Sequence, residues 1–275
     1  MTLLERSQSL HAPTGTRTRY LLDCTTLDST FTTLSSGLQV PEAILQDLLL
    51  SLPPRKLHSR KNMQLGPADD VLWREMKRLY PLRPEGVGTC WFHLTRVRDP
   101  RVFRLGLLNF QKALPGMWDT LWECARPYIS LQDWVRFREN LGNHRLRWLY
   151  DSKLADPTQW GPHGMLIQEA AFQAHLLGNQ DYLDAPETVL DICRCFHGTF
   201  GMDLLTLYRQ NTHPCIVKFR TRGTPQAAWN RALYYCYRHL HQLETPAQSN
   251  LCFDGQGTGI AARDIVHVEV LPLHF

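Results

Sequence analysis

Apolar residues recur along this chain with two periods, and each period predicts a different kind of element. A repeat of three to four positions is typical of a helix that buries one face. It occurs in six stretches: residues 40–52, 68–80, 114–128, 130–141, 185–198 and 224–244. Pro41, Pro186 and Pro225 lie at the beginning of three of these stretches. Proline is favoured in the first turn of a helix, so these residues support the predicted starts.

Short segments rich in aromatic and β-branched residues predict strands. Residues 88–97 and 213–223 have this composition and are expected to form core strands. Basic and apolar residues alternate over residues 144–151, which also predicts a strand. Weaker strand patterns occur at residues 19–24 and after the glycine-rich residues 254–259, while residues 163–172 fit a strand or a helix equally. Helices and strands do not alternate regularly. We therefore expect an α+β fold with a mixed, mostly antiparallel central sheet and surrounding helices.

The order of these segments suggests how the chain is organised. Residues 1–80 are expected to form a helical and extended N-terminal segment that packs on an α+β core domain of residues 81–275. A basic stretch bounded by prolines, residues 53–67, is expected to be a solvated loop. The two parts are expected to form one continuous domain, because 275 residues suffice for a single large core.

Composition and charge exclude few classes of function. Hydrophobic residues make up 43% of the chain and charged residues 20%, with a formal net charge of +4, which permits an anionic ligand without requiring nucleic acid. No apolar run is long enough to span a bilayer and the first residues do not resemble a signal peptide, so we expect a cytoplasmic protein without a membrane partner. The eight cysteines are expected to be reduced.

Candidate chemistry concentrates in the predicted strand at residues 88–97. His93 and Thr95 are two positions apart, so they share a strand face with Trp91, whereas Arg96 points the opposite way. An imidazole beside a hydroxyl offers a donor and an acceptor to a planar amide or to a ribose hydroxyl. A short helix capped by Asp99 is expected to follow and to end at Gly106, which permits a left-handed backbone.

This stretch resembles the first strand of the ADP-ribosyltransferase fold. The DarT nucleic-acid ADP-ribosyltransferases, the tRNA 2′-phosphotransferases and the poly-ADP-ribose polymerases carry a similar His-x-Thr or His-x-Ser strand, a short helix and Gly-Leu. The matching residues are His93, Thr95, Gly106 and Leu107, and the closing segment, residues 257–271, is similar to the last segment of several such enzymes. The resemblance implies NAD as a substrate, transfer to a nucleic-acid or protein acceptor and, in bacteria, a role as a toxin or defence effector.

The resemblance also implies roles for individual residues. His93 and Thr95 would orient the dinucleotide, with Arg96 and Gly106 beside it. A glutamate would support the oxocarbenium-like centre, and the first candidate is Glu169, a lone acid in an apolar run. Tyr150 would stack on nicotinamide. Further candidates are Arg147 and Arg145 for the pyrophosphate, and Glu187 and Glu269 as alternative acids.

Other interpretations of the same residues remain open. In the first, the protein is a non-catalytic binding or scaffold protein and His93 is a hydrogen-bonded core residue. In the second, scattered histidines and aspartates serve a hydrolase or nuclease. No metal site is expected, because Cys193 and Cys195 diverge on a helix and lack a second pair of ligands near His197. Two weaker patterns are a Cys–His pair at Cys215 and an aromatic stripe over residues 234–241, which could stack bases.

Overall fold

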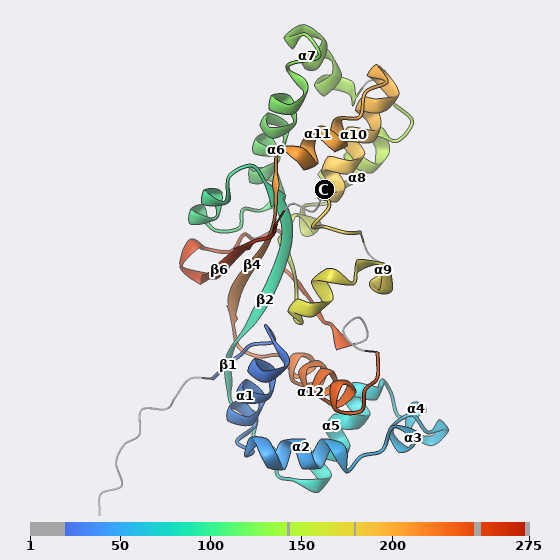
Figure 1. Ribbon diagram of the computed structural model, residues 1–275, viewed down its shortest axis with the longest axis vertical. Helices are drawn as coiled ribbons and strands as arrows, with labels where there is room; N and C mark the ends of the chain where they lie inside the picture. The colour runs from blue at the N-terminus through green and yellow to red at the C-terminus, as the bar shows by residue number, and fades with distance from the viewer. Residues whose placement is uncertain (1–19, 142–143, 179, 245–248, 273–275) are drawn as a thin grey trace, which may run out of the picture.

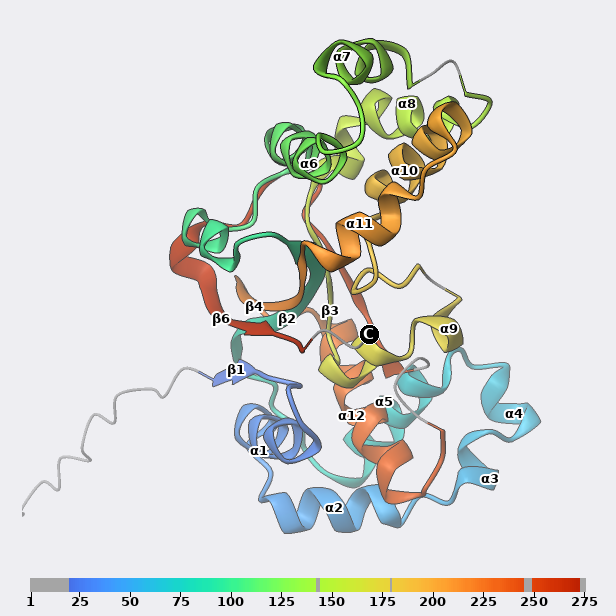
Figure 2. The ribbon, with the colours of Figure 1, turned by 45° about the horizontal axis from the view of Figure 1, so that its top comes forward.

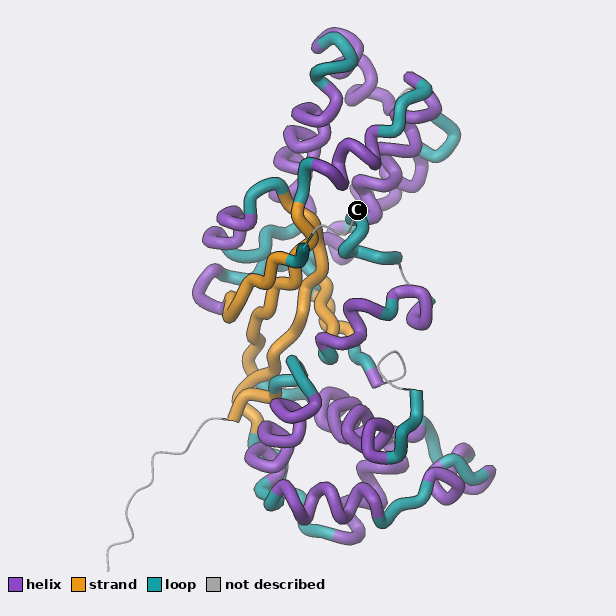
Figure 3. The backbone as a smooth tube through the Cα atoms, viewed as in Figure 1, coloured by secondary structure: helices purple, strands orange, loops and turns teal. Residues whose placement is uncertain are grey.

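The fold is built around one sheet with helices at both of its ends (Figures 1 and 3). The computed structural model describes residues 20–141, 144–178, 180–244 and 249–272. Its sheet has six strands, in the order β5-β3-β2-β4-β6, with β1 also paired to β2. The strands are β1 (Tyr20–Leu22), β2 (Gly86–Val97), β3 (His163–Met165), β4 (His213–Arg222), β5 (Cys252–Asp254) and β6 (Ile265–Val270). The pairing of β1 with β2 is parallel and the other pairings are antiparallel.

The long antiparallel pair of β2 and β4 forms the centre of the sheet. Its register runs from Gly88 opposite Arg222 to Val97 opposite His213. Residues opposite one another project from the same face, so one face carries His93 with Val217 and the other carries Phe92 with Lys218. We refer to these as the His93 face and the Lys218 face.

One group of helices covers the end of the sheet where β2 begins. Its members are α1 (Leu27–Leu38), α2 (Glu42–Leu50), α3 (Pro54–Leu57), α4 (Arg60–Met63), α5 (Ala68–Leu79) and α12 (Gln226–Leu240). Helix α12 lies against α1, α2 and α5 (Figure 2). These helices and the sheet share one hydrophobic core, in which Tyr237, Phe92 and Phe219 are among the largest fully buried side chains.

A second group of helices stands at the opposite end (Figure 2). It contains α6 (Phe110–Ala125), α7 (Leu131–Asn140), α8 (Arg147–Ala155), α10 (Glu187–Phe200) and α11 (Leu204–Gln210). Its core is separate from that of the sheet and is rich in rings, in which Trp118 and Phe196 each contact both Trp134 and Phe137. The shorter elements are η1 (Pro100–Leu105), η3 (Pro157–Trp160), η4 (Gln168–Phe172), α9 (Ala174–Leu177) and η5 (Ala262–Asp264).

The observed elements confirm the predicted fold class, an α+β fold with a mostly antiparallel sheet surrounded by helices. The strand predicted at residues 144–151 is wrong, because this stretch enters helix α8. Leu146 and Tyr150 are four residues apart and both pack on the second core, a spacing that serves a helix. Residues 163–172 contain both alternatives, the short strand β3 and then η4. Within residues 53–67, the structure forms helices α3 and α4 where a loop was expected.

The sequence patterns did not identify helix α1. It begins with a capping box between Thr26 and Ser29, but its buried face includes Thr30 and Gly37 beside its apolar residues, so the hydrophobic period is weak. In the described ranges, no helix combines the length and apolarity that crossing a bilayer would need.

Candidate functional site

His93 sits where β3 separates from β2. The ladder between these strands has one pair, Phe92 with Met165, and His93 is the next residue along β2. Its Nδ1 lies 2.7 Å from the carbonyl oxygen of His163. A carbonyl only accepts hydrogen bonds, so Nδ1 carries the proton and, in the neutral ring, Nε2 keeps its lone pair. Burial lowers the pKa of His93, so the ring is neutral at pH 7.

Thr95 projects from the same face, two residues further along the strand. It lies opposite Cys215 on β4, and both His93 and Thr95 are only partly buried. Toward the other end of β2 the same face is filled, because the ring of Trp91 packs against Phe253 with centroids 5.5 Å apart. The imidazole and the hydroxyl are thus partly exposed polar groups of β2 on the His93 face.

The chain that follows β2 interlocks with the segment that precedes β6. Leu107 and Ile260 exchange main-chain hydrogen bonds of 2.9 and 2.8 Å. Asn109, which caps α6, also donates from its side-chain amide to the carbonyl of Gly257 at 3.0 Å. Gly106 has a φ of +90°, and an added Cβ there would lie 2.1 Å from the carbonyl oxygen of Ile260. The structure therefore gives Gly106 a role in packing, with the space beside it already taken by main chain.

Arg96 points to the Lys218 face and is held by main chain from two distant segments. Its guanidinium donates to the carbonyl oxygens of Leu183, Arg209 and Thr212 at 3.0, 2.7 and 2.9 Å, and to the hydroxyl of Thr212 at 3.1 Å. Burial lowers its pKa, but an arginine remains charged at any physiological pH. These bonds assign Arg96 to joining β2 to α11 and its flanks rather than to the His93 face.

A cavity of about 510 Å³ opens beside Arg96. It is lined by Asp181 and Asp184 before α10, by Arg209 on α11, and by Pro214 at the start of β4. The ion pair between Arg209 and Asp184, at 2.5 Å, satisfies much of this charge within the protein. The cavity belongs to the junction between the sheet and the second helical group, not to the His93 face.

Glu169 lies on the Lys218 side of the sheet, in η4. Its neighbour Gln168 donates to Glu269 at 2.8 Å, and Glu269 stands opposite Ile216, on the same face as Lys218. The carboxylate of Glu169 accepts from the hydroxyl of Tyr235 at 2.8 Å and lies 3.2 Å from Nε2 of His239. Burial and this carboxylate together raise the pKa of Tyr235, which stays protonated and donates. The structure thus brings Glu169 to helix α12 and not to His93.

Tyr150 and Arg147 both lie on α8, in the second helical group. The Tyr150 hydroxyl accepts from the indole nitrogen of Trp118 at 3.1 Å, so the ring is part of that aromatic core. Arg147 pairs with Asp151 one turn away at 3.1 Å. Neither contact connects these residues to the His93 face. The neighbouring Arg145 is exposed at the same end of the molecule.

Four features proposed from the sequence remain: Glu187, the two cysteines near His197, Cys215 and the aromatic stripe of α12. Glu187 accepts from Tyr182 at 3.0 Å. Cys193 and Cys195 are buried in the second core while His197 is exposed, and no group of three metal-binding side chains occurs in the described residues. Burial raises the pKa of Cys215 to about 11, which leaves a thiol rather than a nucleophilic thiolate. The aromatic stripe of α12 is core, because its tyrosines are buried.

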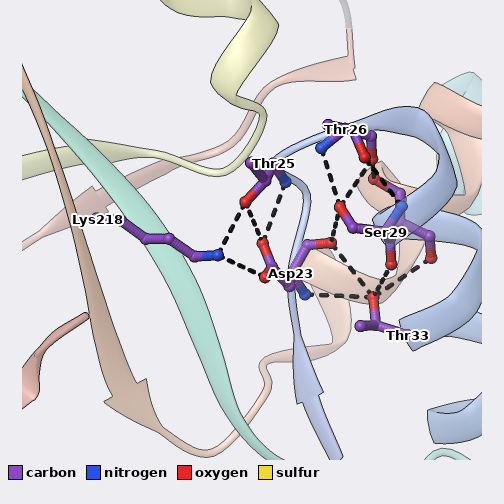
Figure 4. Close-up of polar contacts among 7 residues, drawn as sticks. Asp23, Thr25, Thr26, Ser29, Thr33 and Lys218 are labelled. Atoms are coloured by element: carbon purple, nitrogen blue, oxygen red, sulfur yellow. Dashed lines mark hydrogen bonds and ion pairs between the residues drawn. The ribbon is translucent and has the colours of Figure 1, made fainter. Parts of the chain in front are cut away.

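A polar cluster on the Lys218 face was not found from the sequence (Figure 4). The ammonium of Lys218 contacts the carboxylate of Asp23 at 2.5 Å and the hydroxyl of Thr25 at 2.9 Å. Asp23 also accepts from Thr25, and its own main chain is bonded to Thr33. The cluster fastens the turn between β1 and α1 to the middle of β4. A signal was present in the sequence, since Lys218 is a single charge inside the apolar run CIVKF.

Comparisons of the chain with protein-family models, with curated proteins and with solved structures find no match.

Proposed function

We propose that this chain binds NAD at the His93 face and uses it as an ADP-ribosyl donor. In this reaction the bond between nicotinamide and C1′ of the ribose breaks, and nicotinamide leaves with the bonding electron pair. A nucleophile on a nucleic acid or a protein then forms a bond to C1′ and loses its proton.

One observation carries the proposal. The two segments that resemble ADP-ribosyltransferases are separated by about 150 residues in sequence, yet they interlock through the Leu107–Ile260 bridge, and the second of them leads into β6. Two short resemblances that arose independently by chance would have no reason to meet. Their meeting, between the segment that follows β2 and the segment that leads into β6, supports the assignment of this face.

The side chains at this face fit the groups that NAD would present. With Nδ1 bonded to His163, the neutral ring of His93 offers Nε2 as an acceptor for a ribose hydroxyl. The hydroxyl of Thr95 both donates and accepts, which suits the carboxamide of nicotinamide. The proposal relies on these two residues, and it gives Glu169 no part in binding the dinucleotide.

The decisive experiment measures thermal stability and nicotinamide release in the presence of NAD. A ligand that binds only the native state at 100 times its Kd stabilises that state by about 2.7 kcal/mol, which raises the melting temperature by several degrees. We expect this shift in the wild type and its loss in His93→Ala and Thr95→Val. Glu169→Gln is the matched control on the other face, and it should keep both the shift and the release.

An unchanged melting temperature of the wild type at millimolar NAD would overturn the proposal. So would an equal shift in wild type and His93→Ala. If His93→Ala loses the shift as expected but Glu169→Gln also stops nicotinamide release, the binding face stands and the acid predicted from the sequence regains its catalytic role.

The bond from His93 to the carbonyl of His163 favours a second candidate, a non-catalytic binding or scaffold protein. In that case His93 only fastens β3 to β2. His93→Gln separates the two functions, because its amide donor can replace the Nδ1 proton. A purely structural histidine predicts that this variant keeps its stability and that NAD affects neither protein.

A further inference from the structure

Strand β6 forms an edge of the sheet over the residues that the structure describes, since β4 is its one neighbour in the strand order. The hydrogen bond from the Leu271 nitrogen to the carbonyl of Pro214, at 2.9 Å, fixes which groups face β4. Main-chain groups alternate in direction along a strand, so those of Glu269 and His267 also face β4. The N–H and C=O groups of Val268 and Val270, which lie in the regular part of the register, therefore point outward, to the free edge.

This edge has few of the features that prevent strands from pairing. Natural edges carry lysine or proline, or twist away from the sheet. The stretch Val266–Val270 contains neither residue, and its one irregularity is a register shift at its first residue, Val266, which is skipped between the pairs Lys218–His267 and Phe219–Ile265. Val266 and Val270 are 48% and 46% exposed, so both present apolar surface at this edge.

The sequence of the strand is complementary to itself in an antiparallel arrangement. If two copies align about Val268, then Val266 of each copy lies opposite Val270 of the other. In the same register His267 lies opposite Glu269, which pairs an imidazole with a carboxylate on the Lys218 face. Val268 would exchange main-chain hydrogen bonds with Val268 of the second copy, and the outward groups of Val270 would face Val266, the residue at the register shift. Shifting the register by two residues loses part of this pairing.

We propose that a second copy of this chain adds to the edge of β6, so that the two sheets continue into one another across a two-fold axis. Apolar surface beside the edge extends the contact. Leu105 and Val102 on η1, an element that lies against β6, are 71% and 47% exposed. An interface made of two paired edge strands and the apolar surface beside them is smaller than a typical obligate interface, so the dimer is expected to be reversible.

Sedimentation over a range of concentrations tests the association. We expect the weight-average mass to rise from one chain toward two between micromolar and near-millimolar protein. Val268→Pro should stay monomeric, because it removes an outward N–H without touching the ladder to β4. Val135→Lys, which changes an exposed valine on α7, is the control and should associate like the wild type. A wild type that stays monomeric throughout would overturn the proposal.

Engineered cysteines test the register and do not depend on how Val268→Pro folds. They are placed in a Cys252→Ser background, because Cys252 is exposed and the other native cysteines are buried. Val268→Cys puts two Cα atoms about 5.5 Å apart across the axis, within reach of a disulfide. Val266→Cys puts its two copies about 14 Å apart, since four residues separate them along the strand. Oxidation should link the first variant and not the second, and equal linking of both would refute the register.

Discussion

Arg96 offers the most direct test of how the sheet is joined to the second helical group. Its guanidinium donates to main-chain oxygens before α10 and around the end of α11, and the hydroxyl of Tyr208 donates in return to the carbonyl of Arg96 at 3.0 Å. Arg96→Met keeps the apolar stem and removes every donor. Three carbonyl oxygens then lose a charged partner in a site that is only partly open to water.

The expected loss follows from these contacts. An acceptor left without a partner costs about 1–3 kcal/mol, and partial exposure favours the lower end of that range. Three carbonyl oxygens therefore give about 3 kcal/mol, which lowers the melting temperature by about 6–12 °C for a chain of this size. Arg96→Lys should lose an intermediate amount, because one ammonium cannot span acceptors on both segments.

Urea unfolding followed by tryptophan fluorescence measures these values. Arg98→Met is the matched control, because Arg98 comes directly after the end of β2. Its guanidinium pairs with Glu123 at 3.2 Å, and its side chain is 56% exposed. An exposed pair of this kind is worth less than about 1 kcal/mol. A loss of less than about 1 kcal/mol in Arg96→Met, or an equal destabilisation of Arg98→Met, would contradict this role of Arg96.

Two further predictions concern glycine and pH. Gly106→Ala should lower the free energy of unfolding by more than about 2 kcal/mol, because its φ is +90° and main chain occupies the space of a Cβ. Gly116→Ala inside α6 should raise the free energy of unfolding by about 0.5–1 kcal/mol, because no atom lies within 4 Å of the added Cβ. Urea titration of both variants measures the two changes. The lowered pKa of His93 means that the unfolded chain binds its proton first, so stability should fall as the pH drops below 6.5, by at most about 1.4 kcal/mol per pH unit, and remain level above it. His93→Gln should make this part of the curve flatter, and an unchanged curve would argue against a lowered pKa of His93 in the folded protein.

The sequence predicted the elements whose side chains follow one period closely. Strands β2 and β4 and helix α12 lie where their patterns place them, because each buries a continuous apolar face. The error at α8 has a different cause. Over eight residues, alternation and helical spacing share several positions, and the packing of Leu146 and Tyr150 on distant helices decides between them.

The candidate site could be predicted only in part. That His93 and Thr95 share a face follows from alternation alone, and the register with β4 agrees. The partner of His93 is a main-chain carbonyl 70 residues away, and the partners of Arg96 are mostly carbonyls as well. Carbonyl groups are present at every position, so no residue type signals these contacts. Glu169 was chosen for its apolar surroundings, but those surroundings come from α12, on the other side of the sheet.

Two cations on the Lys218 face explain how the two helical groups keep a fixed relation to the sheet. Arg96 binds α11 and its flanks at one end of β2, and Lys218 binds the turn between β1 and α1 from the middle of β4. Apolar packing is not directional, so each group could slide on the sheet with little loss of buried area. A partly buried charge, in contrast, loses its partners when it moves, and an unpaired charge in such a site is costly. The two cations therefore set the position of each helical group while the apolar cores supply most of the stability, and both cations lie on the face opposite His93.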